Sequence, residues 1–255
     1  MPRFKDQAIC IRDLDWSETS QVVVLLTEQH GKLRGLAKGS RRQSPSSVQR
    51  FSGGIELLTA GQVIATTRPS SELAAITEWD LQDDYFPLRR DLRGQRVAMY
   101  AADVCSAMLA DADPHPGAFG LLRTLLETLC RPGGALGAAW DAEVEAALLR
   151  FQWGLLGDLG YRPELERDVR SGGTLKSVPA YTFDPVAGGL TSERGIADWR
   201  VRRGTVDVLR AVASGDAELG ADGAIPGRAN RLLCVYVRAL LDKQLPTMEV
   251  VLGTE

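Results

Sequence analysis

Residues 20–38 read SQVVVLLTEQHGKLRGLAK and contain two different strand patterns separated by a turn. Residues 20–27 are a run of β-branched and aliphatic side chains, a composition typical of a buried strand. Residues 28–31 predict the turn, because Gly31 can adopt a positive φ. From Lys32 to Lys38 charged or small residues alternate with apolar ones, which predicts a strand with one exposed face.

Further strands are predicted on both sides of this stretch. Residues 7–12 read as a strand before it, and residues 39–54 form a polar loop rich in Ser, Arg and Gly after it. Residues 55–59 and 62–67 predict a hairpin that turns at Ala60-Gly61. Five short strands with a long loop after the third suit a small closed barrel of the OB type.

The hydrophobic period becomes helical after about residue 86. Apolar stripes predict helices over 92–110, 116–129, 141–159, 205–213 and 230–245, and we assign these stripes to the core. Residues 161–198, rich in Gly, Ser and Pro, fit a small lobe or a long loop equally well. The predicted fold class is α+β: a barrel over 1–80 and an all-helical domain over 81–255 that carries this insert.

The charge is distributed unevenly along the chain. The net charge of the 255 residues is −3, but residues 1–70 hold ten Lys or Arg against six Asp or Glu. Residues 29–55 lack acidic side chains and contain six cations: Lys32, Arg34, Lys38, Arg41, Arg42 and Arg50. Such a block predicts an anionic partner, and guanidinium groups bind phosphate through two parallel hydrogen bonds. We therefore predict a nucleic-acid-binding face, with ordinary surface charge as the alternative.

Three aromatic residues lie in the first 70 positions, namely Phe4, Trp16 and Phe51. Phe51 follows Arg50 at the end of the basic loop, where it would stack on a base or pack into the core. Both alternatives stay open. A recognition helix with basic and amide side chains is not evident, so readout of a specific DNA sequence is not expected.

The remaining sequence features argue against several classes of protein. The longest aliphatic run, Val22–Leu26, is far too short to span a membrane, and the N-terminal residues do not resemble a signal peptide, so we expect a cytoplasmic protein. The chain has two histidines and four scattered cysteines, and it lacks a phosphate-binding loop and a nucleophile elbow. The acidic pairs Asp83/Asp84, Asp111/Asp113 and Glu143/Glu145 read as solvated charges. We predict neither an enzyme nor a bound cofactor.

Several motifs resemble the bacterial RecO family of recombination mediators in their order and spacing. In the first block these are Gln7–Arg12, Glu18–Ser20, Leu25–Gly31 and Ala37–Arg42. The resemblance continues through Ser52–Leu58, returns in Arg150–Pro163 and ends at Leu245–Glu249. It implies an N-terminal OB-fold, a helical domain and, in most members, a four-cysteine zinc module.

This chain departs from the family in the zinc module. The four cysteine positions fall on Asp168, Ser171, Ser192 and Gly195. Hydroxyl groups and glycine cannot build a tetrahedral zinc site, so we expect no metal here. The lobe is then expected to be held by hydrogen bonds and packing, or to be mobile.

The resemblance also implies a function. RecO proteins bind single- and double-stranded DNA, anneal complementary strands and, with RecR, help to load RecA onto DNA coated by the single-stranded-DNA-binding protein SSB. Two other classes stay open, namely a protein-interaction scaffold without strong DNA binding of its own and an enzyme with an unrecognised site. Nucleoid association would follow from DNA binding.

The acidic C-terminal tail of SSB, which ends in an apolar tip, would need an apolar groove rimmed by cations. Two arginine groups qualify: Arg200, Arg202 and Arg203 before the fourth helix, and Arg228, Arg231 and Arg238 along the last. We favour Arg231 and Arg238, which are seven residues apart and share a helix face beside Leu233, Val237 and Leu241. The alternative is that these arginines only cover the bundle surface.

Overall fold

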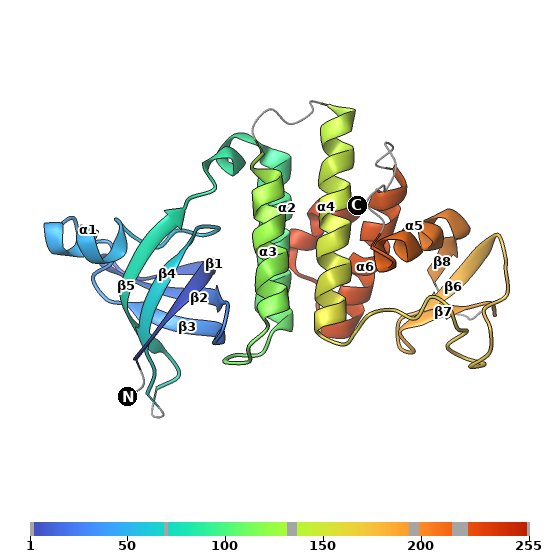
Figure 1. Cartoon of the computed structure of the whole chain (residues 1–255), viewed down its shortest axis with the longest axis horizontal. Helices are drawn as coiled ribbons and strands as arrows, with labels where there is room; N and C mark the ends of the chain where they lie inside the picture. The colour runs from blue at the N-terminus through green and yellow to red at the C-terminus, as the bar shows by residue number, and fades with distance from the viewer. Residues whose placement is uncertain (1–2, 69–70, 132–136, 194–198, 216–223, 254–255) are drawn as a thin grey trace. The chain divides into compact units, whose positions relative to one another are not determined.

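The computed structural model describes residues 3–68, 71–131, 137–193, 199–215 and 224–253. The chain forms two compact units, Met1–Arg131 and Pro132–Glu255 (Figure 1). The first unit contains the barrel together with two helices, and the second contains the remaining helices and a small sheet. Among the described helices, none is both long and apolar enough to cross a membrane.

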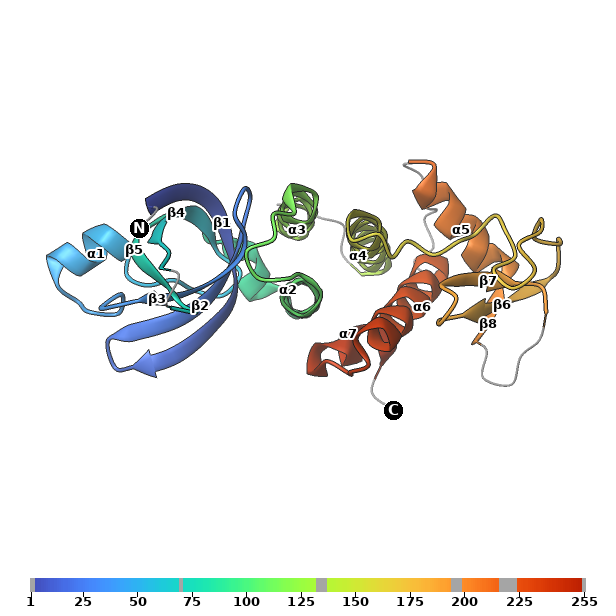
Figure 2. The same ribbon diagram turned by 90° about the horizontal axis from the view of Figure 1, so that it is seen from below.

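The first unit is built on a closed five-stranded barrel in which the order is β1-β2-β3-β5-β4 and β4 pairs back to β1. The strands are β1 (Arg3–Ser17), β2 (Ser20–Thr27), β3 (Gly31–Ala37), β4 (Ala60–Thr66) and β5 (Ala74–Asp83). Helix α1 (Pro45–Phe51) lies between β3 and β4 along the chain, and Figure 2 shows the strands curving around the barrel. The predicted α+β class with an N-terminal OB-like barrel is confirmed.

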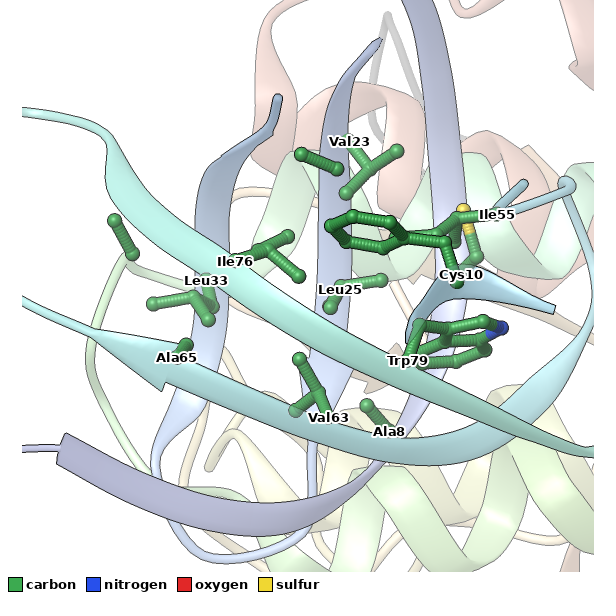
Figure 3. Packing of buried hydrophobic residues seen from close by; sticks show 13 residues of the cluster. Ala8, Cys10, Val23, Leu25, Leu33, Ile55, Val63, Ala65, Ile76 and Trp79 are labelled. Atoms are coloured by element: carbon green, nitrogen blue, oxygen red, sulfur yellow. The ribbon is translucent and has the colours of Figure 1, made fainter. Parts of the chain in front are cut away.

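Strand β2 is buried along its whole length because both of its faces are covered. Val23 and Leu25 point into the barrel, where they join Val63 and Trp79 in the core (Figure 3). The outer face of β2, with Val22 and Val24, is covered by α2 (Leu92–Met108) and α3 (Pro116–Leu129), which both contact β2. This double coverage explains the continuous apolar run that the sequence shows at 22–26.

The turn between β2 and β3 depends on Gly31, as expected from the sequence. Its φ is +72°, and an added Cβ would lie 2.2 Å from the Asp113 carbonyl oxygen. The backbone there also accepts a hydrogen bond, because the Ala112 N–H donates to the Lys32 carbonyl oxygen over 2.9 Å. A side chain at this position would therefore displace the segment between α2 and α3.

Two sequence predictions in the first unit are wrong. The predicted hairpin at Ala60-Gly61 does not exist, because residues 60–66 form one strand that pairs with β1 and β5. Residues 39–54 contain α1, which begins after the N-cap Ser44 with Pro45 in the first turn. The N-cap oxygen and proline favour a helix start there, although the segment is too short and polar to show a helical period. A short 3₁₀ helix, η1 (Phe86–Arg90), precedes α2.

The second unit packs α4 (Ala138–Asp158) against α6 (Ala224–Leu241). A buried polar network joins these two helices: Gln152 Nε2 donates to Asn230 Oδ1 over 2.8 Å, and Asn230 Nδ2 donates to the Glu145 carbonyl oxygen over 2.8 Å. The unit also contains α5 (Arg203–Ala213), the 3₁₀ helix η2 (Pro246–Met248) and α7 (Glu249–Leu252). The predicted helix over 116–129 in the first unit is confirmed to the residue, and the other four differ by up to six residues at their ends.

A three-stranded antiparallel sheet forms the lobe that the sequence placed at 161–198. Its order is β7-β6-β8, from β6 (Ala180–Asp184), β7 (Gly189–Thr191) and β8 (Trp199–Arg202). Strand β8 lies just beyond the predicted insert and leads directly into α5, so the sheet is joined to the helices. Phe183 is fully buried and stacks on Trp199, with ring centroids 5.7 Å apart.

Candidate nucleic-acid interface

A groove of about 870 Å³ lies on the barrel beside the seam between β3 and β5. Four cations from four chain segments line it: Lys38 after β3, Arg42 before α1, Arg50 in α1 and Arg68 after β4. The other described residues along it are apolar or uncharged, and none is acidic. The groove therefore offers unbalanced positive charge to an anion.

The barrel topology brings these cations together. Strands β3 and β5 pair in parallel, with Leu36 opposite Ala75 and Ala37 opposite Ile76. The segment that leaves β3 and the segment that enters β5 therefore lie at neighbouring positions of the sheet, so Lys38 and Arg68 line one groove although they are 30 residues apart. Ala74 and Ala75 have small side chains, which keeps the floor of the groove open.

The groove cations are exposed and make few contacts with other groups. Lys38, Arg42, Arg50 and Arg68 are all exposed. Arg50 Nε donates to the Ser46 carbonyl oxygen over 3.3 Å, and its guanidinium lies 5.4 Å from the centre of the Phe51 ring. These contacts orient the Arg50 fork and leave most of its N–H groups available to a phosphate.

The other three cations predicted from the sequence lie in different surroundings. The Lys32 ammonium already has two partners within the protein. Its Nζ lies 3.1 Å from Asp111 Oδ1 and donates to the Ser106 carbonyl oxygen over 2.8 Å, and 13% of the side chain is exposed. Arg41 pairs with Asp13 over 3.0 Å and with Asp15. Arg34 is exposed on β3, on the same face as the groove residue Leu36 two positions later.

Sequence reasoning missed Arg68 and left Phe51 open. Arg68 lies outside the acid-free segment 29–55, and only the strand pairing brings it to the groove. Phe51 is 1% exposed and belongs to the barrel core, so packing is the correct alternative. The positive charge of Arg68 just before β5 could have indicated its role. The wrongly predicted hairpin over 55–67 left no strand after Arg68, so this charge was not considered.

Buried hydrogen bonds fix the segment that carries Lys38 and Arg42. Gln21 is buried; its Oε1 accepts from Ser40 Oγ over 2.9 Å, and its Nε2 donates to the Ile55 carbonyl oxygen over 2.9 Å. The Gly39 N–H donates to Ser20 Oγ over 3.1 Å. The groove wall is therefore preformed, which lowers the ordering cost of binding a ligand.

A second concave site of about 400 Å³ lies in the second unit, between β8, the start of α5 and α6. Its apolar lining comes from Trp199, Val201, Leu232 and Val235, and its arginines are Arg200, Arg202, Arg228 and Arg231. The site thus joins members of both arginine groups that the sequence offered. Arg228 Nε is buried and, within the described part of the chain, lacks a hydrogen-bond acceptor.

The structure separates the two arginines that the sequence had favoured for this site. Arg231 lines the pocket, whereas Arg238 is not among the described residues that do. Leu233 and Val237, expected beside them, are fully buried in the core of the unit. The apolar floor comes instead from Leu232 and Val235, one and two positions away from Leu233 on the same helix.

Comparison with known proteins assigns the chain to a family. A family model described as Recombination protein O N terminal matches residues 1–85, and one described as Recombination protein O C terminal matches residues 89–249. The chain belongs to the RecO family. A protein named DNA repair protein RecO from Myxococcus xanthus strain DK1622 is 28% identical over 98% of this chain and 97% of its own length. One of the same name from Anaeromyxobacter sp. strain Fw109-5 is 33% identical over 74% of this chain and 68% of its own length.

The zinc module that the family resemblance implied does not fit the residues found in this lobe. Asp168 is 2% exposed, and its carboxylate accepts hydrogen bonds from Ser192 N (2.7 Å), Ser192 Oγ (2.8 Å) and Thr191 Oγ1 (3.1 Å). The N–H groups of Arg170 and Ser171 donate to its other oxygen. Both oxygens are thus saturated by protein donors, and the described residues contain no cluster of three or more His, Cys, Asp or Glu that could hold a metal. Gly195 lies outside the described residues.

These contacts set the protonation state of Asp168. Burial alone would raise its pKa, but the hydrogen bonds donated by Ser192, Ser171 and Arg170 outweigh burial and hold the pKa well below its usual value. The carboxylate therefore stays charged at neutral pH and joins the 168–171 turn to the end of β7.

Several other cysteine, histidine and aspartate side chains contribute to local structure in the described part of the chain. Burial raises the pKa of the Cys105 thiol to about 12 and that of the Cys130 thiol to about 11, which leaves both protonated. His30 Nδ1 lies 2.7 Å from Asp6 Oδ2, and its ring stacks on Phe4. Asp83 Oδ1 accepts from the Tyr85 N–H over 2.8 Å. These side chains therefore stabilise the core and the turns of the chain.

Proposed function

We propose that this RecO-family protein acts in DNA repair and recombination as a DNA-binding mediator rather than as an enzyme. The observation that carries the proposal is the barrel groove, where four cations converge and none of the described lining residues is acidic. The names of the relatives point in the same direction. A protein that acts on chromosomal DNA would work in the cytoplasm, at the nucleoid.

The groove suits the phosphate backbone of single- and double-stranded DNA. Its cations contact charge rather than base edges, so binding is expected to depend weakly on sequence and strongly on salt. Neutralised phosphates repel one another less, which favours annealing of complementary strands. Together with RecR, the protein would then help to load RecA on DNA coated by SSB. Arg34 would extend the groove along β3. Lys32 and Arg41 would mainly stabilise the fold through their ion pairs with carboxylates rather than bind phosphate.

The test is the salt dependence of binding to a fluorescently labelled oligo-dT, measured by anisotropy. If the four groove cations all contact phosphates, log K against log salt should have a slope of about −3, since each contact contributes about −0.7 for single strands. The variant Arg42→Glu/Arg68→Glu should bind at least about 100-fold more weakly and should not anneal strands. Its melting temperature should match that of the unchanged protein, because both side chains are exposed.

The matched control is Lys5→Glu/Arg96→Glu, which changes the net charge equally at exposed positions outside the groove. It should weaken binding by no more than about threefold at physiological salt, where distant charges are screened. Equal losses in both variants would show that net charge, not the groove, binds DNA. Weak binding by the unchanged protein would favour the alternative, a scaffold of the same pathway without strong DNA binding.

For the second concave site we propose the acidic C-terminal tail of SSB as the partner. The arginine rim and apolar floor of the pocket match a peptide that carries carboxylates next to an apolar tip. Arg228 supports this choice further, because a buried guanidinium N–H without an acceptor is stabilised when a carboxylate reaches it.

Calorimetry with a synthetic tail peptide and the full chain tests this assignment. Arg228→Glu/Arg231→Glu should weaken binding by about tenfold or more, since two charge-assisted contacts become repulsive. Arg238→Glu is the control, because Arg238 lies on the same helix but not in the pocket. An effect of Arg238→Glu equal to that of the pocket variant would move the site along α6.

A further inference from the structure

Trp16 is the most exposed large apolar side chain of the barrel. Its exposed fraction is 63%, whereas Trp79 in the barrel and Trp153 in the second unit are almost completely buried. Leu14, two positions earlier on the same strand, is 49% exposed. Tryptophan gains more than most side chains from burial, so an exposed one beside a second apolar residue indicates a contact surface.

The structure holds this residue close to the groove. Trp16 lies at an irregularity of β1, between Asp15 and Ser17, where the regular pairing with β2 is interrupted. Such bulges alter the direction of a side chain. Ser17 pairs with Ser20, and Ser20 Oγ accepts from the N–H of the groove residue Gly39 over 3.1 Å. Two strand spacings, about 10 Å, therefore separate the end of β1 from the segment that carries Lys38 and Arg42.

Arg41 joins the two elements and changes the charge around Trp16. Its guanidinium pairs with Asp13 and Asp15, and its backbone N–H donates to the Thr19 carbonyl oxygen over 3.2 Å. Two carboxylates beside Trp16 would repel a phosphate chain, and pairing with Arg41 reduces that repulsion. The exposed indole thus lies on the strand that carries this cluster, in which one guanidinium faces two carboxylates. The groove cations lie about two strand spacings away.

We propose that Trp16 stacks on a base of single-stranded DNA whose phosphates lie on Lys38, Arg42, Arg50 and Arg68. The inference rests on the proposed DNA-binding function and deepens it, because it assigns the preference between single and double strands. Unpaired bases expose a flat π face that an indole can cover, whereas bases inside a duplex are already stacked on one another. The charge of the neighbouring groove favours a polyanion over an apolar protein partner.

The experiment compares Trp16→Ala, Trp16→Phe and the unchanged full-length protein on a labelled oligo-dT and on a duplex of equal length. Trp16→Ala should weaken single-strand binding by about tenfold or more, since stacking is the interaction removed, and duplex binding by less than about twofold. Its salt slope should not change, because no phosphate contact is lost. Trp16→Phe should keep most of the affinity and lose the quenching of tryptophan fluorescence that oligo-dT causes.

Phe86→Ala is the matched control, since Phe86 is a 45% exposed aromatic of the same unit that does not line the groove. It should leave both affinities unchanged. Unchanged single-strand affinity in Trp16→Ala, or equal losses on single strand and duplex with an intact melting curve, would overturn the assignment of Trp16. Failure of the groove itself would appear differently, as DNA binding that Arg42→Glu/Arg68→Glu does not weaken.

Discussion

The barrel groove and the pocket of the second unit both present four cations. They differ in the residues that form their floors and in the elements that carry their cations. The groove takes its cations from four chain segments around a wide floor that includes Ala74, Ala75 and Thr77. The pocket takes its arginines from one strand and one helix around an apolar floor that includes Leu232 and Val235. On the functions proposed above, cationic side chains would serve an extended polyanion in one place and a short anchored peptide in the other.

The two sites also depend on different scaffolds. The groove lies on a closed barrel, in which every strand is paired on both sides. One wall of the pocket is β8, an edge strand of a three-stranded sheet, and β7 on the opposite edge is held to residues 168–171 by Asp168. Damage to the lobe should consequently affect the pocket and spare the groove.

The largest expected effect comes from Asp168→Ala. Removing a buried carboxylate that accepts five hydrogen bonds should lower the free energy of unfolding of the second unit by about 3 kcal/mol or more. Tail-peptide binding should fall with it, whereas oligo-dT binding to the groove should stay within about twofold of the unchanged protein. Urea unfolding and the two binding assays, done on one preparation, provide the measurement.

The control in the same lobe is Glu166→Ala, which removes only an exposed ion pair with Arg210 and should cost less than about 1 kcal/mol. Equal effects of the two substitutions would contradict the special role of Asp168. Chelator should not shift the unfolding curve, because the residues described here offer no metal cluster. A melting temperature that EDTA lowers would reveal a metal held in some other way.

The pH dependence follows from the lowered pKa of Asp168. A group whose pKa is lowered in the folded state stabilises that state fully above its pKa in the unfolded chain, about 3.9 for an aspartate. The stabilisation is then lost as the pH falls from there through the lower folded value. Asp168→Ala should therefore show a weaker loss of stability below pH 4 than the unchanged protein.

The sequence predicts the fold well where local pattern and tertiary structure agree. The apolar run at 22–26 and the stripe at 116–129 each specify an element. Burial on both faces leaves a continuous apolar run, and burial on one face leaves a clear helical period. Strand β5 was missed, since Thr77 and Glu78 are both half-buried at a bulge in the pairing with β4, which interrupts the alternation. Non-local pairing with β3 and β4 stabilises it instead.

The candidate sites could be predicted only in part, for the same reason. The acid-free segment contains three of the four groove cations, but the sequence cannot show that Lys32 and Arg41 are already paired. It also cannot show that Arg68 arrives from another strand or that Arg200 and Arg231 share one pocket. Composition locates a charge along the chain, and only the fold determines which charges remain without partners.

The two lysines at the ends of β3 provide a smaller test, because Lys32 has partners within the protein whereas Lys38 is exposed in the groove. Lys32→Met removes a mostly buried ammonium with two partners, so it should lower the free energy of unfolding by about 1–2 kcal/mol and leave the DNA affinity unchanged. Lys38→Met should do the reverse, with an unchanged melting curve and an affinity lower by about three- to tenfold. If both variants lose DNA affinity equally, the groove extends along all of β3.

The smallest expected effect distinguishes the neighbours Arg41 and Arg42. Arg42→Gln removes a groove cation, so the salt slope for oligo-dT should become less steep by about 0.7. Arg41→Gln removes a partly exposed ion pair, so it should cost less than about 1 kcal/mol of stability and leave the slope unchanged. Its affinity should fall slightly, because Asp13 and Asp15 are then unbalanced beside Trp16. The slope, measured over four salt concentrations, separates a lost phosphate contact from this longer-range repulsion, and a less steep slope in Arg41→Gln would place Arg41 among the residues that touch DNA.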